Sequence, residues 1–293
     1  MLTGPTNHRR RLGADLRDLR ERRGLRIEEV ADHLGVVAST LSRIETGKAP
    51  TKTSYLKLLL DLYGVDDQAR RRELANLARE GQRKGWWAPD EDVLRDGYGA
   101  FLGLEADAVR HRIFVAQAVP VLLQTEPYAA AVVAAARPEL SAEQQARLVA
   151  VQLRRQHVLD RLDSQCGEQF RLDVVLDEAV LLRAMGDPWL MRDQLERLAQ
   201  TASRPGVTIR VLSLATGGAR APVGSFGILS FPAGGGPDVA GVEGVRAQVL
   251  LEQRPAEVGA LGRLFASLEQ AALPVTESLN LIRELAGDGV RAG

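Results

Sequence analysis

The fold of the N-terminal region is decided by residues 26–48, which run RIEEVADHLGVVASTLSRIETGK. The apolar positions at the start of this stretch share the spacing of one helix face and are Ile27, Val30, Ala31 and Leu34. Gly35 then ends the pattern, so the first helix is only about two turns long. A second short helix follows, and the small Ala31 lies where the two would cross closely. Two short helices joined by a turn that contains glycine predict a helix-turn-helix.

The second helix of the pair turns a small polar face outward. It buries Leu41 and Ile44, and its outward positions are Ser39, Thr40, Ser42 and Arg43. An arginine can bond bidentately to guanine in the major groove, and hydroxyls can reach phosphates or base edges. The hydroxyls of Ser39 and Thr40 also suit a second role, the capping of the helix N-terminus. Arg43 likewise suits either DNA contact or a solvated surface.

Three further helices are expected around this pair. A leucine-rich helix ends before Gly24, a fourth helix runs from a cap at Thr53 to a stop at Gly64, and a fifth begins at Asp66 or Asp67. The first 80 residues are therefore predicted to form an all-α domain of five helices.

Charge is unevenly distributed along the 293 residues, although the overall formal charge is zero. Residues 1–85 hold 18 Lys and Arg against 12 Asp and Glu, a net charge of +6, and residues 86–293 carry the compensating −6. The basic end is the candidate for nucleic-acid contact, although an arginine-rich helix surface can also be only a solvated face. The single cysteine, Cys166, excludes an intrachain disulfide, and the absence of an apolar leader favours a cytoplasmic protein.

Residues 9–51 resemble the helix-turn-helix of the XRE family, the phage-repressor-like regulators. The specific part of the resemblance is Ser42–Lys48, which runs S-R-I-E-T-G-K. The chain departs from the family where polar pairs usually open two of the helices, because it has Arg26-Ile27 before the first and Val37-Ala38 before the recognition helix. A phosphate-gripping and a base-reading side chain are missing there.

The resemblance implies contact with double-stranded DNA through the second helix. The candidate DNA-binding residues are Ser39, Thr40, Ser42, Arg43 and Lys48, with Arg26 and Lys52 as auxiliary phosphate partners. Glu45 is excluded from this set, because a carboxylate beside DNA repels phosphate. We expect Glu45 to form a structural ion pair with an arginine of the first helix.

The chain after residue 80 divides into a linker and a larger domain. Residues 81–92 contain charged residues, a glycine, two tryptophans and a proline, which is typical of a junction. Residues 93–293 are predicted to form an α+β domain with strands in its second half.

Helical patterns dominate the first half of this domain. We expect a helical stretch from Leu94 to a break at Pro120, a helix capped by Thr125, and a helix that begins with the capping box of Ser141 and Gln144. Alternating patterns predict strands at 170–176, 207–211, 226–231, 239–242 and 245–251, and helical patterns predict helices at 187–202, 255–272 and 277–286.

Residues 86–285 resemble the large C-terminal domain of uncharacterised function found on actinobacterial XRE regulators of the WhiJ-like, antitoxin-like group. The motifs that carry the resemblance are Trp86-Trp87 and residues 104–108, 120–125, 128–129, 154–156, 176–181, 194–195 and 207–212. The departures are Val121, where a glycine is usual, and Gly241, where an aromatic residue is common, and either could alter a pocket or a partner surface. Such genes commonly lie beside a gene for a very small protein, so the resemblance implies a protein partner.

No arrangement of residues predicts catalysis. Cys166 and His157 lie nine residues apart across an expected helix end, and the four histidines have no metal-ligand spacing. The glycines at 234–236 lack the Lys-Ser/Thr that a phosphate loop needs. Asp177-Glu178 follows a strand and is expected to cap the next helix, with a ligand or partner contact as the alternative. We therefore expect neither an enzyme, nor a cofactor, nor a metal.

The hypothesis that follows is a cytoplasmic, nucleoid-associated, sequence-specific transcriptional regulator that binds DNA as a homodimer. Its C-terminal domain is expected to bind the small protein from the neighbouring gene and no membrane. Two alternatives stay open: a regulator controlled by a small-molecule ligand, and a protein-interaction module with a degenerate DNA-binding domain.

Overall fold

The structure is a computed structural model that describes residues 5–163, 169–216, 224–232, 235–243, 248–250 and 254–288. Cys166, Gly234 and, within the strand expected at 245–251, residues 245–247 and 251 lie outside these ranges. The chain divides into two compact units. The first, called here the N-terminal unit, comprises Met1–Ala88, Leu102–Asp107 and Phe231–Gly236, and the second, called the sheet unit, comprises Pro89–Phe101, Ala108–Ser230 and Pro237–Gly293.

The N-terminal unit contains the five helices predicted from the sequence. They are α1 Pro5–Arg22, α2 Ile27–Leu34, α3 Ala38–Glu45, α4 Thr53–Leu62 and α5 Gln68–Gln82. Leucines from all five helices and Ile44 form one buried cluster. Gly24, Gly35 and Gly64 have positive φ, the left-handed conformation that ends helices most easily at glycine. The glycine stops used to delimit these helices are therefore confirmed.

One predicted cap in this unit is wrong. Thr53 is the first residue of α4, and the cap position is occupied by Lys52, whose side chain makes no capping hydrogen bond. The fifth helix begins as expected, because the Asp67 carboxylate accepts a hydrogen bond of 2.9 Å from the Ala69 amide.

The sheet unit is α+β, as predicted. Its helices are α6 Tyr98–Asp107, which belongs to this unit only up to Phe101, α7 Glu126–Ala136, α8 Ala142–Arg155, α9 Glu178–Leu182, α10 Pro188–Ala202, α11 Pro255–Ala271 and α12 Val275–Asp288. Short 3-10 turns lie at Ala88–Val93, Val121–Leu123, Gln156–Asp163 and Leu214–Thr216. Its strands are β1 Arg110–Val115, β2 Arg171–Asp177, β3 Val207–Leu212, β4 Phe226–Ser230, β5 Val239–Glu243 and β6 Gln248–Leu250. Thr125 caps α7, and the capping box of Ser141 and Gln144 begins α8.

The helical stretch expected between Leu94 and Pro120 is wrong over Arg110–Val115, which forms the strand β1. Two arginines hid the alternation of this strand. The side chain of Arg110 pairs with Asp173 on β2 at 2.6 Å, and that of Arg112 pairs with Asp238 at 2.9 Å. Charged residues are thus accommodated in β1 by partners that are distant in sequence.

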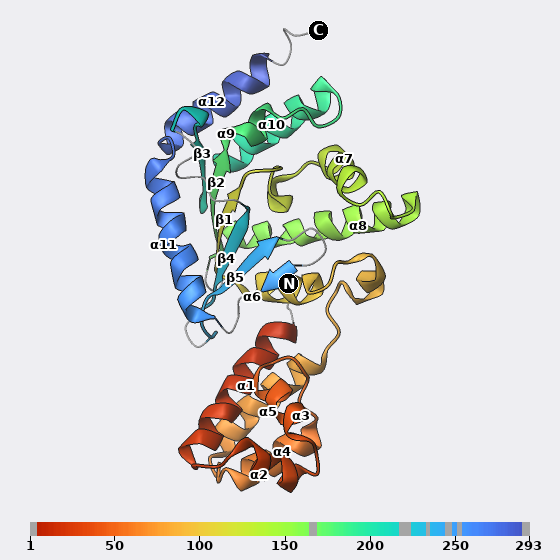
Figure 1. The fold of residues 1–293 in the computed structure, drawn as a ribbon, viewed down its shortest axis with the longest axis vertical. Helices are drawn as coiled ribbons and strands as arrows, with labels where there is room; N and C mark the ends of the chain where they lie inside the picture. Colours follow the sequence, from red (N-terminus) through yellow and green to blue (C-terminus); the bar gives the residue numbers. More distant parts are fainter. Residues whose placement is uncertain are drawn as a thin grey trace. The chain divides into compact units, whose positions relative to one another are not determined.

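The strands form one mixed sheet in the order β3-β2-β1-β4-β5-β6. β1 is parallel to β2, and β2 to β3, whereas β1 and β4, β4 and β5, and β5 and β6 are antiparallel pairs. Figure 1 shows α11 on one side of the sheet and α7, α8 and α10 on the other. The strand order reverses at β1, because the chain first builds β2 and β3 on one side and then β4 to β6 on the other.

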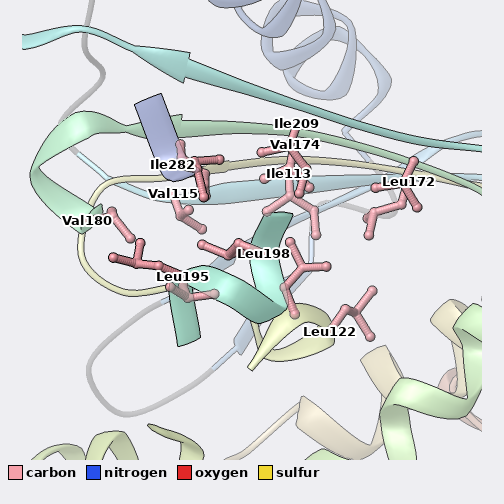
Figure 2. Packing of buried hydrophobic residues seen from close by; sticks show 14 of the residues in the cluster. Ile113, Val115, Leu122, Leu172, Val174, Val180, Leu195, Leu198, Ile209 and Ile282 are labelled. Carbon is pink, nitrogen blue, oxygen red and sulfur yellow. The ribbon is translucent and has the colours of Figure 1, made fainter. Parts of the chain in front are cut away.

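Two apolar clusters join the helices to the sheet. On one face, Leu198 of α10 and Ile282 of α12 lie against Ile113, Val174 and Ile209 of the strands (Figure 2). On the other face, Phe114, Ile228 and Ala240 pack with α11 through Phe265 and Leu268. The two clusters bury both faces of the parallel strands. No helix among the described residues is both long and apolar enough to cross a membrane.

Candidate nucleic-acid interface

The exposed surface of α3 gathers the polar residues predicted from the sequence. Ser39, Ser42 and Arg43 are exposed and Thr40 is partly exposed, while Leu41 and Ile44 are buried. Residues three and four apart lie on one side of a helix, so Ser39, Ser42 and Arg43 share a surface. We call Ser39, Thr40, Ser42 and Arg43 the α3 face. It presents hydroxyls and one guanidinium on a helix of eight residues.

The start of α3 decides between the two roles considered for Ser39 and Thr40. The cap position is Val37, which makes no side-chain capping bond, and the helix begins at Ala38. Within the described part of the chain, neither hydroxyl has a hydrogen-bond partner. Neither hydroxyl caps α3, so both are available to a ligand outside the helix.

The three other predicted cations lie at the ends of neighbouring elements. Lys48 is exposed just after α3, and Lys52 is exposed at the start of α4 with its Nζ 5.4 Å from the centre of the Tyr55 ring. Arg26 precedes α2, where its guanidinium donates to the Glu29 carboxylate at 3.1 Å and 3.2 Å. An exposed pair of this kind contributes little, so a phosphate can compete for Arg26.

Glu45 forms the ion pair that the sequence predicted. The Arg20 guanidinium of α1 donates to both oxygens of the Glu45 carboxylate, at 2.7 Å and 3.0 Å, and a third bond of 2.8 Å goes to the Leu25 carbonyl. The side chains are 12% and 4% exposed, so the pair lies inside the unit. A bidentate pair fixes orientation as well as distance. Glu45 thereby ties the end of α3 to α1.

This pair perturbs its neighbours electrostatically. The hydrogen bond to Glu45 raises the pKa of Arg20, which stays charged. Burial raises the pKa of the nearby Tyr63 hydroxyl, and the negative charge of Glu45 raises it further. The phenol is therefore held neutral beside the ion pair.

Two glycines that the sequence analysis did not single out set the packing of α3. A Cβ atom at Gly13 of α1 would lie 2.5 Å from the Ile44 carbonyl oxygen and 2.6 Å from that of Glu45. Gly47 has a φ of +70°, and a Cβ there would lie 2.8 Å from Cα of Arg10. Only glycine permits this approach. A glycine inside a helical pattern was the available signal at Gly13.

The motif Ser42–Lys48 thus has separable parts. Ile44, Glu45 and Gly47 hold α3 in place, whereas Ser42, Arg43 and Lys48 are exposed. A helix held rigidly from below, with small polar groups and an arginine above, has the chemistry needed to read base edges and hold phosphates.

Comparison with known families assigns both units. A family model described as a domain of unknown function (DUF5753) matches residues 98–284, which is more than half of the chain. The chain belongs to the DUF5753 family. A second model, described as a helix-turn-helix domain, matches residues 11–74 and supports a DNA-binding regulator. No curated protein and no solved structure matches the chain.

The DUF5753 region holds the remaining residues that the sequence analysis considered. Asp177 caps α9 by accepting from the Ala179 amide at 2.9 Å, as expected. The Glu178 carboxylate instead accepts from the Ser213 hydroxyl at 2.8 Å and the Leu214 amide at 2.7 Å, which fastens the loop after β3. Over the ranges that the structure describes, no three His, Cys, Asp or Glu side chains gather to form a metal site.

Two features were missed or only partly anticipated. Val37, which precedes the α3 face, is 67% exposed, an uncommon position for a branched apolar side chain.

In the DUF5753 region, Val121 and Gly241, the two departures from the resembled group, both line a cavity of about 630 Å³. We call it the sheet cavity. The suggestion that these departures could alter a pocket agrees with their positions.

Proposed function

We propose that this DUF5753 protein is a sequence-specific transcriptional regulator of the XRE type, in which α3 enters the major groove. The observation that carries the proposal is the α3 face, which exposes Arg43 and three hydroxyls above the buried pair of Arg20 and Glu45. The net charge of +6 over residues 1–85 favours approach to a polyanion. Lys48, Lys52 and Arg26 then serve as phosphate contacts that fix the register.

A genome-wide footprint tests this function. Purified full-length chain is incubated with sheared genomic DNA of the organism that encodes it, and bound fragments are recovered at several salt concentrations. The proposal predicts a small set of fragments that share a motif, with affinity that falls as salt rises. Recovery of fragments without any shared motif contradicts sequence-specific binding.

We propose that the operator is bound by a homodimer. One small helix-turn-helix buries too little surface for tight recognition, and such modules usually read half-sites about one turn, roughly 34 Å, apart. Footprints should therefore cover two half-sites with two chains. A single half-site bound by one chain contradicts the dimer.

We further propose that the DUF5753 region binds a small protein encoded next to this gene, in the manner of an antitoxin-like pair. The resemblance to the WhiJ-like group supports this, and the net charge of −6 over residues 86–293 favours a basic partner by electrostatic steering. DNA and partner would then alter each other's affinity by the same factor. Titration of the purified neighbour protein, with and without operator, tests both steps. Absence of binding contradicts the partner, and unchanged operator affinity contradicts the control.

We propose that the protein acts by binding and not by catalysis. We also propose that it acts in the cytoplasm, on the nucleoid. A candidate of a different class, control by a small-molecule ligand, is favoured by one observation, the sheet cavity.

A further inference from the structure

The sheet cavity lies wholly within the sheet unit. It is bounded by β1, β4 and β5 on one side and by residues of α6, α7 and α8 on the other. Its volume of about 630 Å³ falls within the range of small-molecule sites, roughly 300–1,000 Å³.

Two paired glycines form part of the cavity wall. Gly227 of β4 is paired with Gly241 of β5, and Ile113 of β1 is the other partner of Gly227, so the three residues share one face of the sheet. Both glycines line the cavity, and the imidazole of His111, another lining residue, lies over Gly227, where a Cβ would be 2.6 Å from Nε2. On the same face, β2 and β3 carry Leu, Val and Ile residues that α10 and α12 cover. The cavity lies over the part of this face that β1, β4 and β5 form.

The cavity lies where open sheets commonly bind ligands. Residues 117–121 follow the carboxyl end of β1 directly and line the cavity, and Ser225 precedes β4 at the same edge. The strand order reverses at β1. Ligands of open α/β sheets bind outside the carboxyl ends of strands at such a reversal.

The charged groups that line the cavity are all cationic or imidazole. Arginines enter the lining from four places, and no Asp or Glu is among the lining residues that the structure describes. The guanidinium of Arg155, 8% exposed, lies 4.9 Å from the centre of the Phe101 ring and donates to the Tyr98 hydroxyl at 2.8 Å. That of Arg183 donates to the Gln117 carbonyl at 3.0 Å and is exposed, so its remaining N–H groups can meet an anion.

Two buried amide oxygens in the cavity wall, those of Gln124 and Gln152, lack hydrogen-bond partners among the described residues. Gln124 is 3% exposed, and its Nε2 donates to the Val119 carbonyl at 2.7 Å. That bond fixes the orientation of the amide, and its Oε1 has no hydrogen-bond partner among the residues that the structure describes. Gln152 also lines the cavity, and its Oε1 likewise has no hydrogen-bond partner among those residues. Such groups in native proteins usually have a partner.

We propose that the sheet cavity is a binding site for an amphipathic organic anion. Its apolar body packs over Gly227 and Gly241 between the valines of β1, α7 and the 3-10 turn after β1. Its anionic group pairs with arginine, with Arg183 as the accessible member. The site stands on the cavity alone and does not depend on whether the chain binds DNA.

The test uses a matched pair of fluorescent probes on the full-length chain. The anion 8-anilinonaphthalene-1-sulfonate has the required apolar body and charge, and N-phenyl-1-naphthylamine has a similar body without the charge. The site predicts saturable, one-to-one binding of the anion, about tenfold tighter than binding of the neutral probe. Near-ultraviolet circular dichroism confirms that the chain is native during the titration. Binding that is absent, or that does not saturate on the native chain, overturns the proposal.

Substitutions locate the probe. Arg183→Gln should weaken the anion about tenfold and leave the neutral probe unchanged, whereas Arg192→Gln, on α10 outside the cavity, should change neither. Gly241→Leu should abolish binding of both probes by filling the cavity, and if that variant does not fold, Val121→Phe enters the same space from the opposite wall. Undiminished binding to a folded, filled variant overturns the assignment, as does equal loss with Arg183→Gln and Arg192→Gln.

Discussion

The α3 face and the sheet cavity are recognition surfaces of opposite kinds. The α3 face is convex, small and polar, with Arg43 and hydroxyls exposed to solvent. The sheet cavity is concave and largely apolar, and its walls hold arginine and amide oxygens that have no partner among the residues described by the structure. A convex helix fits the groove of a duplex, whereas a hollow of this volume fits a small molecule. This difference supports the two proposals of DNA for the α3 face and of a small organic anion for the sheet cavity.

The two surfaces also rest on different supports. Below α3 lies a buried ion pair, Arg20 with Glu45, and the cavity wall shares Ile113 and Val119 with an apolar cluster that also includes Leu198. Substitutions in either support should therefore damage one surface and spare the other. The following predictions are ordered by the size of the expected effect.

Glu45→Ala should give the largest loss. It leaves the Arg20 charge buried without its carboxylate, which costs about 3–5 kcal/mol of unfolding free energy. Hydrogen exchange measured by mass spectrometry should speed up in residues 5–88 and remain unchanged in the sheet unit. Glu21→Ala, which removes an exposed carboxylate, is the control and should leave exchange unchanged. A loss below about 1 kcal/mol would show that the pair does not support α3.

Leu198→Ala should destabilise the sheet unit. Leu198 is fully buried between α10 and the sheet, and truncation of such a leucine costs about 2–5 kcal/mol. Urea denaturation should show the loss in the sheet unit, with faster exchange in β2 and β3 and unchanged exchange in α1 to α5. Equal acceleration in both units would contradict the separation of the two supports.

Gly13→Ala should have an intermediate effect on the N-terminal unit. The added methyl group meets two backbone carbonyls of α3, and overpacking of this kind costs about 1–3 kcal/mol. Gly287→Ala is the matched control, because it also lies in a helix and a Cβ there meets nothing within 4 Å. That control should be neutral or stabilising by up to about 1 kcal/mol. If both variants have the parent's melting temperature, the close approach of α1 and α3 is misplaced.

Tyr63→Phe should have the smallest effect at neutral pH. The hydroxyl is buried and has no hydrogen-bond partner within the described residues, so its removal should change stability by less than about 1 kcal/mol. Burial raises the folded-state pKa of Tyr63 above the ordinary value of about 10, so the phenol contributes stability below that pH that is lost as pH rises further. The unfolding free energy, measured by denaturation at several pH values above 10, should therefore fall less steeply with pH for Tyr63→Phe than for the parent. Identical slopes would contradict the buried phenol.

The N-terminal unit was predictable because its signals are local. Gly24, Gly35 and Gly64 end helices in the left-handed conformation, and the pairing of Glu45 follows from the cost of a lone carboxylate near phosphate. The failure at Thr53 concerned a choice between neighbouring residues, and α4 begins there without the expected side-chain cap.

The sheet unit was less predictable because its decisive contacts are long-range. β1 was taken for helix because Arg110 and Arg112 interrupt its apolar pattern, and their partners Asp173 and Asp238 lie more than 60 residues away. The sheet cavity is lined by residues far apart in sequence, among them the paired Gly227 and Gly241, and no local pattern indicates that pairing. Helix caps at Thr125, Ser141 and Asp177 were found because they need only three or four residues.

The most direct test of the central claim is the affinity of Arg43→Ala for the operator fragment recovered by footprinting, measured against Arg72→Ala at equal salt. Both substitutions remove one exposed arginine from the N-terminal unit, but Arg72 lies on α5 and outside the α3 face. The account predicts that Arg43→Ala folds like the parent and loses about 1–3 kcal/mol of binding free energy, roughly 5- to 150-fold in Kd, with relaxed sequence preference. Arg72→Ala should bind like the parent. Parental affinity for Arg43→Ala, or equal losses for the two variants, would contradict the assignment of α3 as the DNA-reading helix.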